Sequence, residues 1–196
     1  MYPRARLDAL SDAIFGVAMT LLVLDLRLPD EFHPAGAQEL LEGFYHLVPK
    51  FIPYVLSFLV LGLRWKSGMQ LRTTAEAFGG GYFRWWLFYL LLITCVPFST
   101  TVVGRFPDLS PAVWLYAANT ALIAVAGFGM LAETAQIARD EFLRDRRLSL
   151  AVLFASSLLA IAWSFVSPRQ ALLALALNAA VPRLSRRGAG KAATSK

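Results

Sequence analysis

The chain has 196 residues, of which 57% are hydrophobic and only 16% are charged. A soluble domain carries about 25% charged residues because its surface faces water, so this composition excludes the soluble classes. The formal net charge is +6, but most basic residues flank apolar segments, which is typical of membrane proteins and argues against a nucleic-acid partner. We therefore predict an all-α, polytopic membrane protein.

Charge-poor stretches predict six membrane-spanning helices. Residues 109–132 and 148–168 contain no Asp, Glu, Lys or Arg, and each stretch reaches the roughly 20 residues that a helix needs to cross a bilayer. Proline, glycine and dense charge mark the connections between spans. The predicted spans are residues 6–28, 45–66, 83–104, 109–133, 148–166 and 169–184. They form one transmembrane domain over residues 1–184, and a basic tail, residues 185–196, is predicted to be disordered.

The basic residues predict the orientation of the chain. Of its 19 Lys and Arg residues, 15 lie in the N-terminus, in the connectors between spans two and three and between spans four and five, or in the tail. The opposite side has only Arg27, Lys50, Arg105 and Arg169. The positive-inside rule then places both termini in the cytoplasm, and we expect a multi-pass protein of the inner (plasma) membrane.

The first span is unusual because carboxylates interrupt it. Only twelve residues separate Asp12 from Asp25, which is about 18 Å of helix. A hydrocarbon core of about 30 Å must therefore hold at least one carboxylate inside it or at its edge. A central charge that faces lipid costs about 2.5–3.5 kcal/mol, so Asp12 is expected to face protein or water. We expect this span inside the assembly, and the fourth and fifth spans, apolar all round, facing lipid.

One face of the first span carries four residues at helical spacing. At about 100° per residue, Val17, Thr20, Leu21 and Leu24 share a stripe, and Asp12 points away from it. Such spacing is typical of ordinary helix packing, which is the first interpretation. The second is a constriction of small and medium apolar side chains with one hydroxyl, which would gate a pore by dewetting.

Polar residues near the start of this span also have two interpretations. Ser11 and Asp12 form either a helix-start cap with a charge that the helix dipole favours, or buried polar groups that hold the helix to its neighbours. Arg6 lies six residues before Asp12, too far for an i, i+4 pair. If both side chains matter, each needs a partner on another helix.

Two further clusters flank the membrane. The aromatic cluster consists of Tyr82, Phe83, Trp85 and Trp86. We expect it to anchor the cytoplasmic end of the third span at the headgroups. A cation–π contact to Arg84 is the weaker alternative. The basic cluster before the fifth span either contacts anionic lipid or only sets the orientation; its residues are Arg144, Arg146 and Arg147.

Residues 6–12, Arg-Leu-Asp-Ala-Leu-Ser-Asp, with the run Thr-Leu-Leu-Val-Leu-Asp at 20–25, resemble the first-helix signature of the transmembrane protein 175 family. The family pattern is R-x-x-x-F-S-D, and Leu10 stands here in place of the Phe. Similarity to the later helices of the family is carried by residues 54–62 with Trp65, 90–92 with 97–100, Tyr116 and Asn119, and Ser167-Pro168. Members of the family are potassium-permeable channels of endolysosomes and prokaryotes.

The resemblance implies a six-helix subunit and a homotetramer with the first helices around a central pore. By motif position, Val17, Thr20, Leu21 and Leu24 would line that pore, with Val17 at the narrow layer that a bulkier Ile or Leu usually fills. Arg6, Ser11 and Asp12 would hold the helix against its neighbours. The implied partners are potassium ions, membrane lipid and further copies of the chain, with no cofactor and no bound metal beyond potassium in passage.

The chain departs from the family after Trp65. A pair of histidines is common there, whereas this chain has Lys-Ser-Gly-Met at 66–69, with Lys66 or Arg64 as candidate charged substitutes. The chain also has no T-V-G-Y-G segment, so any selectivity would come from pore width and dehydration.

Three other functions compete with a channel. An intramembrane enzyme needs a convergent nucleophile and base or a metal cluster, and His33, His46 and the single Cys95 do not supply one in sequence. We therefore predict that the chain is not an enzyme. A small secondary transporter, which would typically show repeated halves, and a non-conducting structural or assembly protein, in which the stripe is packing, stay as alternatives.

Overall fold

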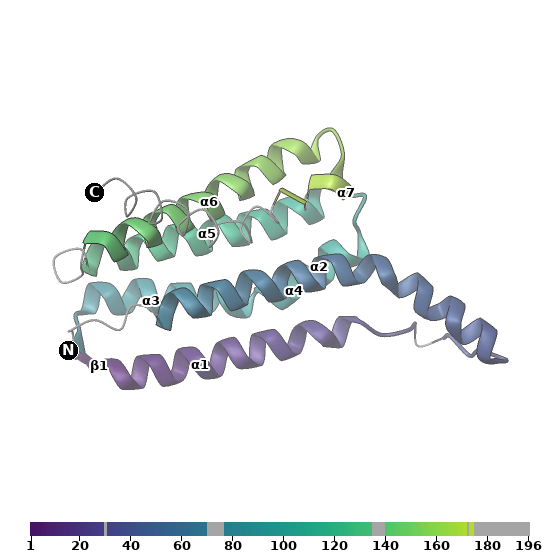
Figure 1. Ribbon diagram of the computed structural model, residues 1–196, viewed down its shortest axis with the longest axis horizontal. Coiled ribbons are helices and arrows are strands. Elements are labelled where there is room, and N and C mark those ends of the chain that lie inside the picture. Colours follow the sequence, from purple (N-terminus) through teal and green to yellow (C-terminus); the bar gives the residue numbers. More distant parts are fainter. Residues whose placement is uncertain (30, 70–76, 135–139, 172, 175–196) are drawn as a thin grey trace, which may run out of the picture.

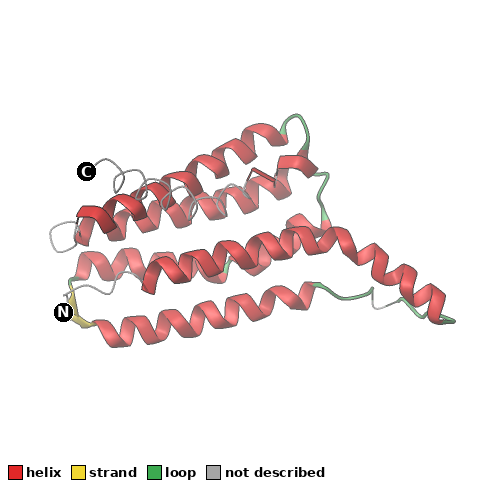
Figure 2. Ribbon diagram, in the orientation of Figure 1, coloured by secondary structure: helices red, strands yellow, loops and turns green. Residues whose placement is uncertain are grey.

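The structure is a computed structural model that describes residues 1–29, 31–69, 77–134, 140–171 and 173–174. Most of these residues are helical (Figure 2). The long helices are α1 (Arg4–Leu21), α2 (Ala37–Met69), α3 (Gly80–Thr94), α4 (Val96–Arg105), α5 (Ser110–Thr134) and α6 (Asp140–Ser164). The short elements are the 3-10 helix η1 (Leu22–Asp25), helix α7 (Pro168–Ala171), and the strands β1 (Tyr2–Pro3) and β2 (Ala77–Phe78).

The long helices run side by side along one axis of the molecule (Figure 1). Helix α5 packs against α6 on one side and against α3 and α4 on the other, α2 packs against α4, and α1 contacts α2, α3 and α4. The first residues of α1, α3 and α6 and the last residues of α2 and α5 lie at the same end of the bundle, on the left of Figure 1. We call it the N-terminal end of the bundle.

Five helical segments are long and apolar enough to cross a membrane. They are Arg4–Asp25, Ala37–Gly68, Gly80–Arg105, Ser110–Thr134 and Leu143–Ser164. These segments confirm the predicted all-α, multi-pass fold class. The predicted sixth span, residues 169–184, lies mostly outside the described residues, and the predicted tail, residues 185–196, lies wholly outside them.

Helix α2 begins eight residues before the predicted second span. Its first turns carry Glu39 and Glu42, and this charge hid them from a search for apolar stretches. Figure 1 shows that α2 bends and that its N-terminal part projects beyond the other helices. Pro49 and Pro53 lie inside the helix. Each proline lacks a backbone donor and crowds the preceding turn, which accounts for the bend.

The third predicted span is two helices rather than one. The break between α3 and α4 is at Cys95, whose backbone N–H donates to the carbonyl oxygens of Leu91 and Leu92 at 3.3 and 3.2 Å. Pro97 stands in the first turn of α4. Proline is tolerated there because the first N–H groups of a helix have no intrahelical acceptor.

Two further differences from the prediction lie at the N-terminal end of the bundle. Helix α6 begins at Asp140, so the basic cluster before the fifth span is helical instead of forming a connector. Strands β1 and β2 pair antiparallel, with Tyr2 opposite Phe78, which adds a short ladder to an otherwise helical fold.

The fourth span is the most buried of the five. In its apolar window 56% of the residues are buried, against 22% for the first span. The expectation that the fourth span faces lipid is therefore wrong. Its buried residues include many small ones, which let neighbouring helices approach closely: Ala112, Ala117, Ala124, Ala126 and Gly127. An all-round apolar helix suits a protein interior as well as lipid.

Candidate functional site

Helix α1 has one face that packs against its own subunit. Its buried residues are Leu7, Phe15 and Ala18, followed by Leu22 in η1, and none exposes more than 6% of its surface. Their spacing of three, four or eight residues keeps them on one side of the helix. This side contacts α2, α3 and α4, which fixes α1 on the bundle.

The four residues of the predicted stripe lie away from that packed face. Val17, Leu21 and Leu24 expose 58%, 44% and 65% of their surface, and Thr20 is also exposed. The subunit therefore leaves an apolar strip of α1 uncovered. The chemistry available on the strip is apolar contact and one hydroxyl oxygen.

The last residue of the stripe is not in the α-helix. Leu24 lies in η1, where the chain turns with about three residues per turn, so a 100° spacing no longer applies to it. The helical segment ends at Asp25, three residues before the predicted boundary. The Thr20 hydroxyl donates to the Val17 carbonyl oxygen at 2.9 Å, which leaves its oxygen lone pairs available on the exposed face.

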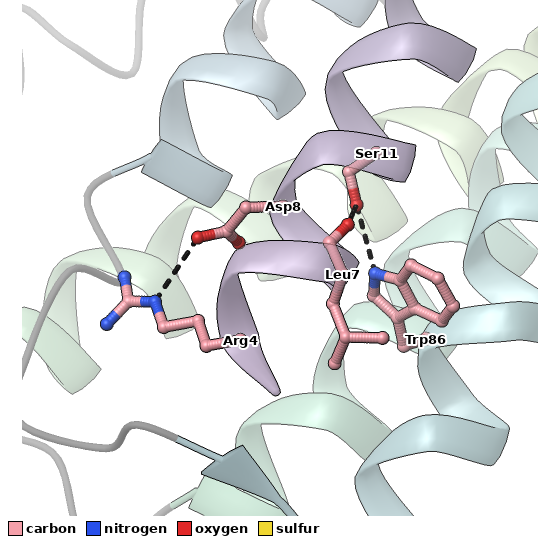
Figure 3. A network of polar contacts seen from close by, with 5 residues as sticks. All are labelled: Arg4, Leu7, Asp8, Ser11 and Trp86. Carbon is pink, nitrogen blue, oxygen red and sulfur yellow. Dashed lines mark hydrogen bonds and ion pairs between the residues drawn. The ribbon is translucent and has the colours of Figure 1, made fainter. Parts of the chain in front are cut away.

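Ser11 and Asp12 contact two different helices. The Ser11 hydroxyl donates to the Leu7 carbonyl oxygen at 2.9 Å and accepts from the indole Nε1 of Trp86 in α3 at 3.0 Å (Figure 3). The Asp12 carboxylate accepts from Nε1 of Trp65 in α2 at 2.8 Å. Since α1 begins at Arg4, two turns earlier, the interpretation of Ser11 and Asp12 as a helix-start cap is wrong.

The charged side chains near this pair do not bond to Asp12. Arg6 is exposed and makes no hydrogen bond or ion pair with the described residues. Two turns before this pair, Arg4 forms an ion pair with Asp8 at 3.3 Å, which Figure 3 draws as a dashed line. Arg64 donates to Ser149 on α6, and Lys66 is exposed.

The partners that sequence reasoning missed are the two tryptophan N–H groups. An indole N–H is a donor only, and a carboxylate at membrane depth needs a donor, so Trp65 and Trp86 were the residues to pair with Asp12 and Ser11. The spacing along the chain, 53 and 75 residues, does not show which tryptophan meets which acceptor.

An ion pair fastens the opposite end of the first span. Asp25 of η1 lies 3.6 Å from Arg105, the last residue of α4, and the Asp25 side chain is only 14% exposed. The two carboxylates that made the first span unusual therefore both bond to other helices. They hold α1 to α2 near one end and to α4 near the other.

A buried polar network joins the helices beneath α1. The Ser57 hydroxyl of α2 lies 2.7 Å from the Thr100 hydroxyl of α4 and 2.9 Å from the Tyr116 hydroxyl of α5. Asn119 of α5 donates to the Leu92 carbonyl oxygen at 3.2 Å. All four side chains are buried, so they stabilise the platform that carries α1 and do not line an open face.

The aromatic cluster at the start of α3 is only partly at the surface. Tyr82 and Trp86 are buried, with 7% and 4% exposure, whereas Trp85 is 37% exposed. The expectation of a headgroup anchor is therefore wrong for Tyr82 and Trp86. Tyr82 stacks on Phe78 of β2 with ring centroids 4.0 Å apart, so the short ladder helps to bury it.

The described residues contain no group of three or more His, Cys, Asp or Glu side chains placed to hold a metal ion. Their polar groups near α1 are instead paired donors and acceptors between helices. The arrangement is that of a positioned helix with one open apolar face.

Comparison with known proteins identifies the relatives of the chain. The family model of the endosomal/lysosomal potassium channel TMEM175 matches residues 6–97, which include α2, α3 and all but the first two residues of α1. A potassium channel of Streptomyces collinus is 29% identical over 126 residues, which cover 64% of this chain and 60% of that protein. Potassium channels of Chamaesiphon minutus and a Chryseobacterium species are 27% and 26% identical over 123 residues, or 61% and 63% of this chain. In each case the aligned region spans about 60% of the relative's length.

A solved structure shares the fold. The crystal structure of a lysosomal potassium-selective channel TMEM175 homolog from Chamaesiphon minutus superimposes with a TM-score of 0.75 at 22% sequence identity. The match covers 92% of this chain and 97% of that one, so it extends beyond the region that the family model matches. The chain therefore resembles the TMEM175 channel over residues 6–97 and shares the fold of the solved homologue over most of its length.

Proposed function

We propose that the chain is one subunit of a potassium-permeable cation channel in which α1 lines the pore. The observation that carries this proposal is the exposed strip of Val17, Thr20, Leu21 and Leu24, opposite the packed face of α1. The relatives and the solved homologue are named as potassium channels, and none is named as an enzyme, in agreement with the sequence prediction.

The exposed strip of α1 must contact lipid, protein or water in the membrane, and Asp12 argues against lipid alone. Asp12 is exposed in the single subunit, and the one indole donor of Trp65 uses only part of the capacity of its carboxylate. A charge facing hydrocarbon costs several kcal/mol, so protein or water must lie beyond it. Further copies of the chain around a water-filled axis meet this need, and the proposed assembly is a homotetramer with four α1 helices around the pore.

The strip also suggests how ions would pass. Three apolar side chains and one hydroxyl form a narrow layer that excludes water when the pore is tight and admits a partly dehydrated ion when it widens. The chain has no T-V-G-Y-G filter, so discrimination between potassium and sodium would depend on pore width and dehydration at Val17, Leu21 and Leu24. Conduction through such a layer is passive.

The orientation of the channel follows from its charges. The N-terminal end of the bundle gathers most of the described basic residues of the helices, among them Arg4, Arg6, Arg84, Arg144 and Arg147. By the positive-inside rule this end faces the cytoplasm. The proposed location is the inner (plasma) membrane, with both termini cytoplasmic.

Ion flux through the purified protein in liposomes tests the proposal. The flux is measured under a potassium gradient, then under a sodium gradient, for the wild type and for Val17→Trp. The matched control is Val125→Trp, because Val125 is an exposed valine of α5 outside the strip. We expect flux that favours potassium, survives Val125→Trp and falls at least tenfold in Val17→Trp.

The same experiment separates the alternatives. Flux that survives Val17→Trp places the pore elsewhere than on α1. No flux from protein that is assembled in the liposomes favours the non-conducting structural role. Saturable, coupled uptake with a strict co-ion requirement favours a small secondary transporter.

A further inference from the structure

Two arginines are buried side by side in the fold at the N-terminal end of the bundle. Arg64 of α2 is 4% exposed and Arg146 of α6 is 8% exposed. Their hydrogen bonds go to neutral acceptors: Nη2 of Arg64 donates to the Ser149 hydroxyl at 2.6 Å, and Nη1 of Arg146 donates to the Ser67 carbonyl oxygen at 3.2 Å. Within the described part of the chain neither arginine has a carboxylate partner.

The donor capacity of these arginines is not used up. A guanidinium carries five N–H donors, and the structure gives each arginine one acceptor. Nε of Arg64 is buried and has no hydrogen-bond partner among the described atoms. A buried charged donor without an acceptor is costly, so the site calls for an acceptor that the described part of the chain does not supply.

Both arginines line one cavity of about 50 Å³ between α1 and the other helices. A water molecule needs roughly 10–15 Å³ of cavity volume, so this cavity is large enough for a few waters or one small oxyanion. Its other polar lining residues include Ser11, Tyr82 and Tyr89. Phe15, Phe78 and Met130 form apolar walls, which exclude the counterions that would neutralise an exposed arginine.

The described residues that line the cavity carry a net positive charge. Among them are three arginines, Arg4, Arg64 and Arg146, and one carboxylate, Asp8. Asp8 is 56% exposed at its side chain and pairs with Arg4, so it compensates neither buried guanidinium. Figure 3 shows Asp8 and Ser11 on the same helix as Arg4, with Trp86 facing Ser11.

From this geometry we infer that the cavity binds a phosphate group between Arg64 and Arg146. Guanidinium groups present planar forks that match phosphate oxygens two at a time, and burial strengthens such charge-assisted hydrogen bonds. The hydroxyls of Tyr82 and Tyr89 supply neutral donors beside the forks. The phosphate belongs either to the headgroup of an anionic phospholipid or to a free phosphate.

The inferred site does not depend on conduction. It lies on the packed side of α1, away from the strip of Val17, Thr20, Leu21 and Leu24, and its ligand would bridge α2 and α6 beneath the start of α1. An absence of ion flux would therefore leave the binding experiment unaffected.

The test measures the midpoint of thermal unfolding of the full chain with two probes. The first is inorganic phosphate, added to protein in an uncharged detergent and compared with sodium chloride at equal ionic strength. The second is phosphatidylglycerol, added to phosphatidylcholine nanodiscs that hold the protein. We expect a saturable rise in the unfolding midpoint with one probe or both. A rise in both assigns the phosphate group itself, and a rise with phosphatidylglycerol alone assigns the lipid headgroup.

Two variants and one control locate the effect. Arg146→Gln is expected to abolish the rise, and Arg64→Lys, which keeps the charge but loses the fork, is expected to weaken binding by about tenfold. Arg147→Gln is the matched control, because Arg147 is the exposed neighbour of Arg146 on α6, and it is expected to keep the full rise. If Arg146→Gln does not fold, Arg146→Lys replaces it with the same expected weakening as Arg64→Lys. No rise with either probe beyond the chloride and phosphatidylcholine references overturns the inference, and so does an equal loss in Arg147→Gln.

Discussion

Helices α1 and α5 are similarly hydrophobic but differ in how much of each is buried in the subunit. Helix α5 is surrounded by its own subunit, and 56% of its apolar window is buried. Helix α1 is buried over only 22% of its window, along a single packed face, and it carries the carboxylate of Asp12. The helix with a carboxylate well inside its length is thus the peripheral one in the subunit, and the helix whose one charged residue, Glu133, lies in its last turn is the central one.

The difference shows that the hydrophobicity of a helix in a membrane protein does not reveal its surroundings. Lipid and protein interior are equally apolar, so hydrophobicity alone does not tell which of them surrounds a helix. Side-chain size is more informative, because many of the buried residues of α5 are alanines and its Gly127 lies against Leu150 of α6. Substitutions on α1 and α5 test the contrast between a buried core helix and a helix with an exposed strip.

The largest expected effect comes from the same change made on both helices. Val113→Trp adds a large ring where α5 has no free surface, which overpacks the site and costs about 3 kcal/mol of unfolding free energy. Val17→Trp enters the open strip and should change the stability of the subunit by less than about 0.5 kcal/mol. Thermal unfolding of the purified variants measures both. Equal destabilisation would mean that the strip is as tightly packed as the core of α5.

A smaller effect is expected from the polar network that joins α2, α4 and α5. Tyr116→Phe removes the hydroxyl that contacts Ser57, while Ser57 keeps its bond to Thr100. We expect a loss of about 1–2 kcal/mol, because the network is buried and cannot recruit water freely. Tyr45→Phe is the control, since Tyr45 is 78% exposed. An equal and negligible effect in both variants would show that the network adds no stability.

The two tryptophan bonds to α1 should be weaker still. Trp65→Phe removes the donor to the Asp12 carboxylate and is expected to cost about 1 kcal/mol, since a charged acceptor loses its partner at a partly exposed position. Trp86→Phe removes a donor to the neutral Ser11 hydroxyl and is expected to cost about 0.5 kcal/mol for that bond. Trp163→Phe, at an exposed position of α6, controls for the loss of ring volume. The reverse order of the two effects would contradict a charge-assisted bond to Asp12.

The smallest expected effect is at the far end of α1. Arg105→Gln breaks the ion pair with Asp25 and should cost about 0.3 kcal/mol, because the arginine side chain is half exposed and solvent screens the pair. High salt should reduce the effect further. Arg84→Gln, at an exposed residue of α3, is the control. A loss above 2 kcal/mol that persists in high salt would mean that the pair is shielded from water.

Sequence reasoning reached the features that depend on one helix at a time. The approximate positions of the five described spans follow from charge-poor stretches, and the grouping of Val17, Thr20 and Leu21 follows from the helical period. The packed face of α1 could also be predicted from the helical period. These features depend on residues that are close together in the sequence, so the hydrophobic periodicity of the chain predicts them.

The features that sequence reasoning missed depend on which helices meet. The contacts of Trp65 with Asp12 and of Trp86 with Ser11 join residues more than fifty positions apart, and nothing in their spacing selects them. The central place of α5 and the burial of Arg146 depend on packing between helices in the same way. The broken third span was readable in principle, because Pro97 already marks the point where a new helix can begin.

The break between α3 and α4 has a practical consequence for labelling. Cys95 is the only cysteine of the chain, and it is exposed at that break. A thiol-reactive label therefore has a single possible position in each subunit. Replacement of Cys95 by Ser gives a thiol-free background, into which cysteines can be placed one by one at residues 17, 20, 21 and 24. The rate at which a water-borne reagent modifies each of them traces where water touches the first helix.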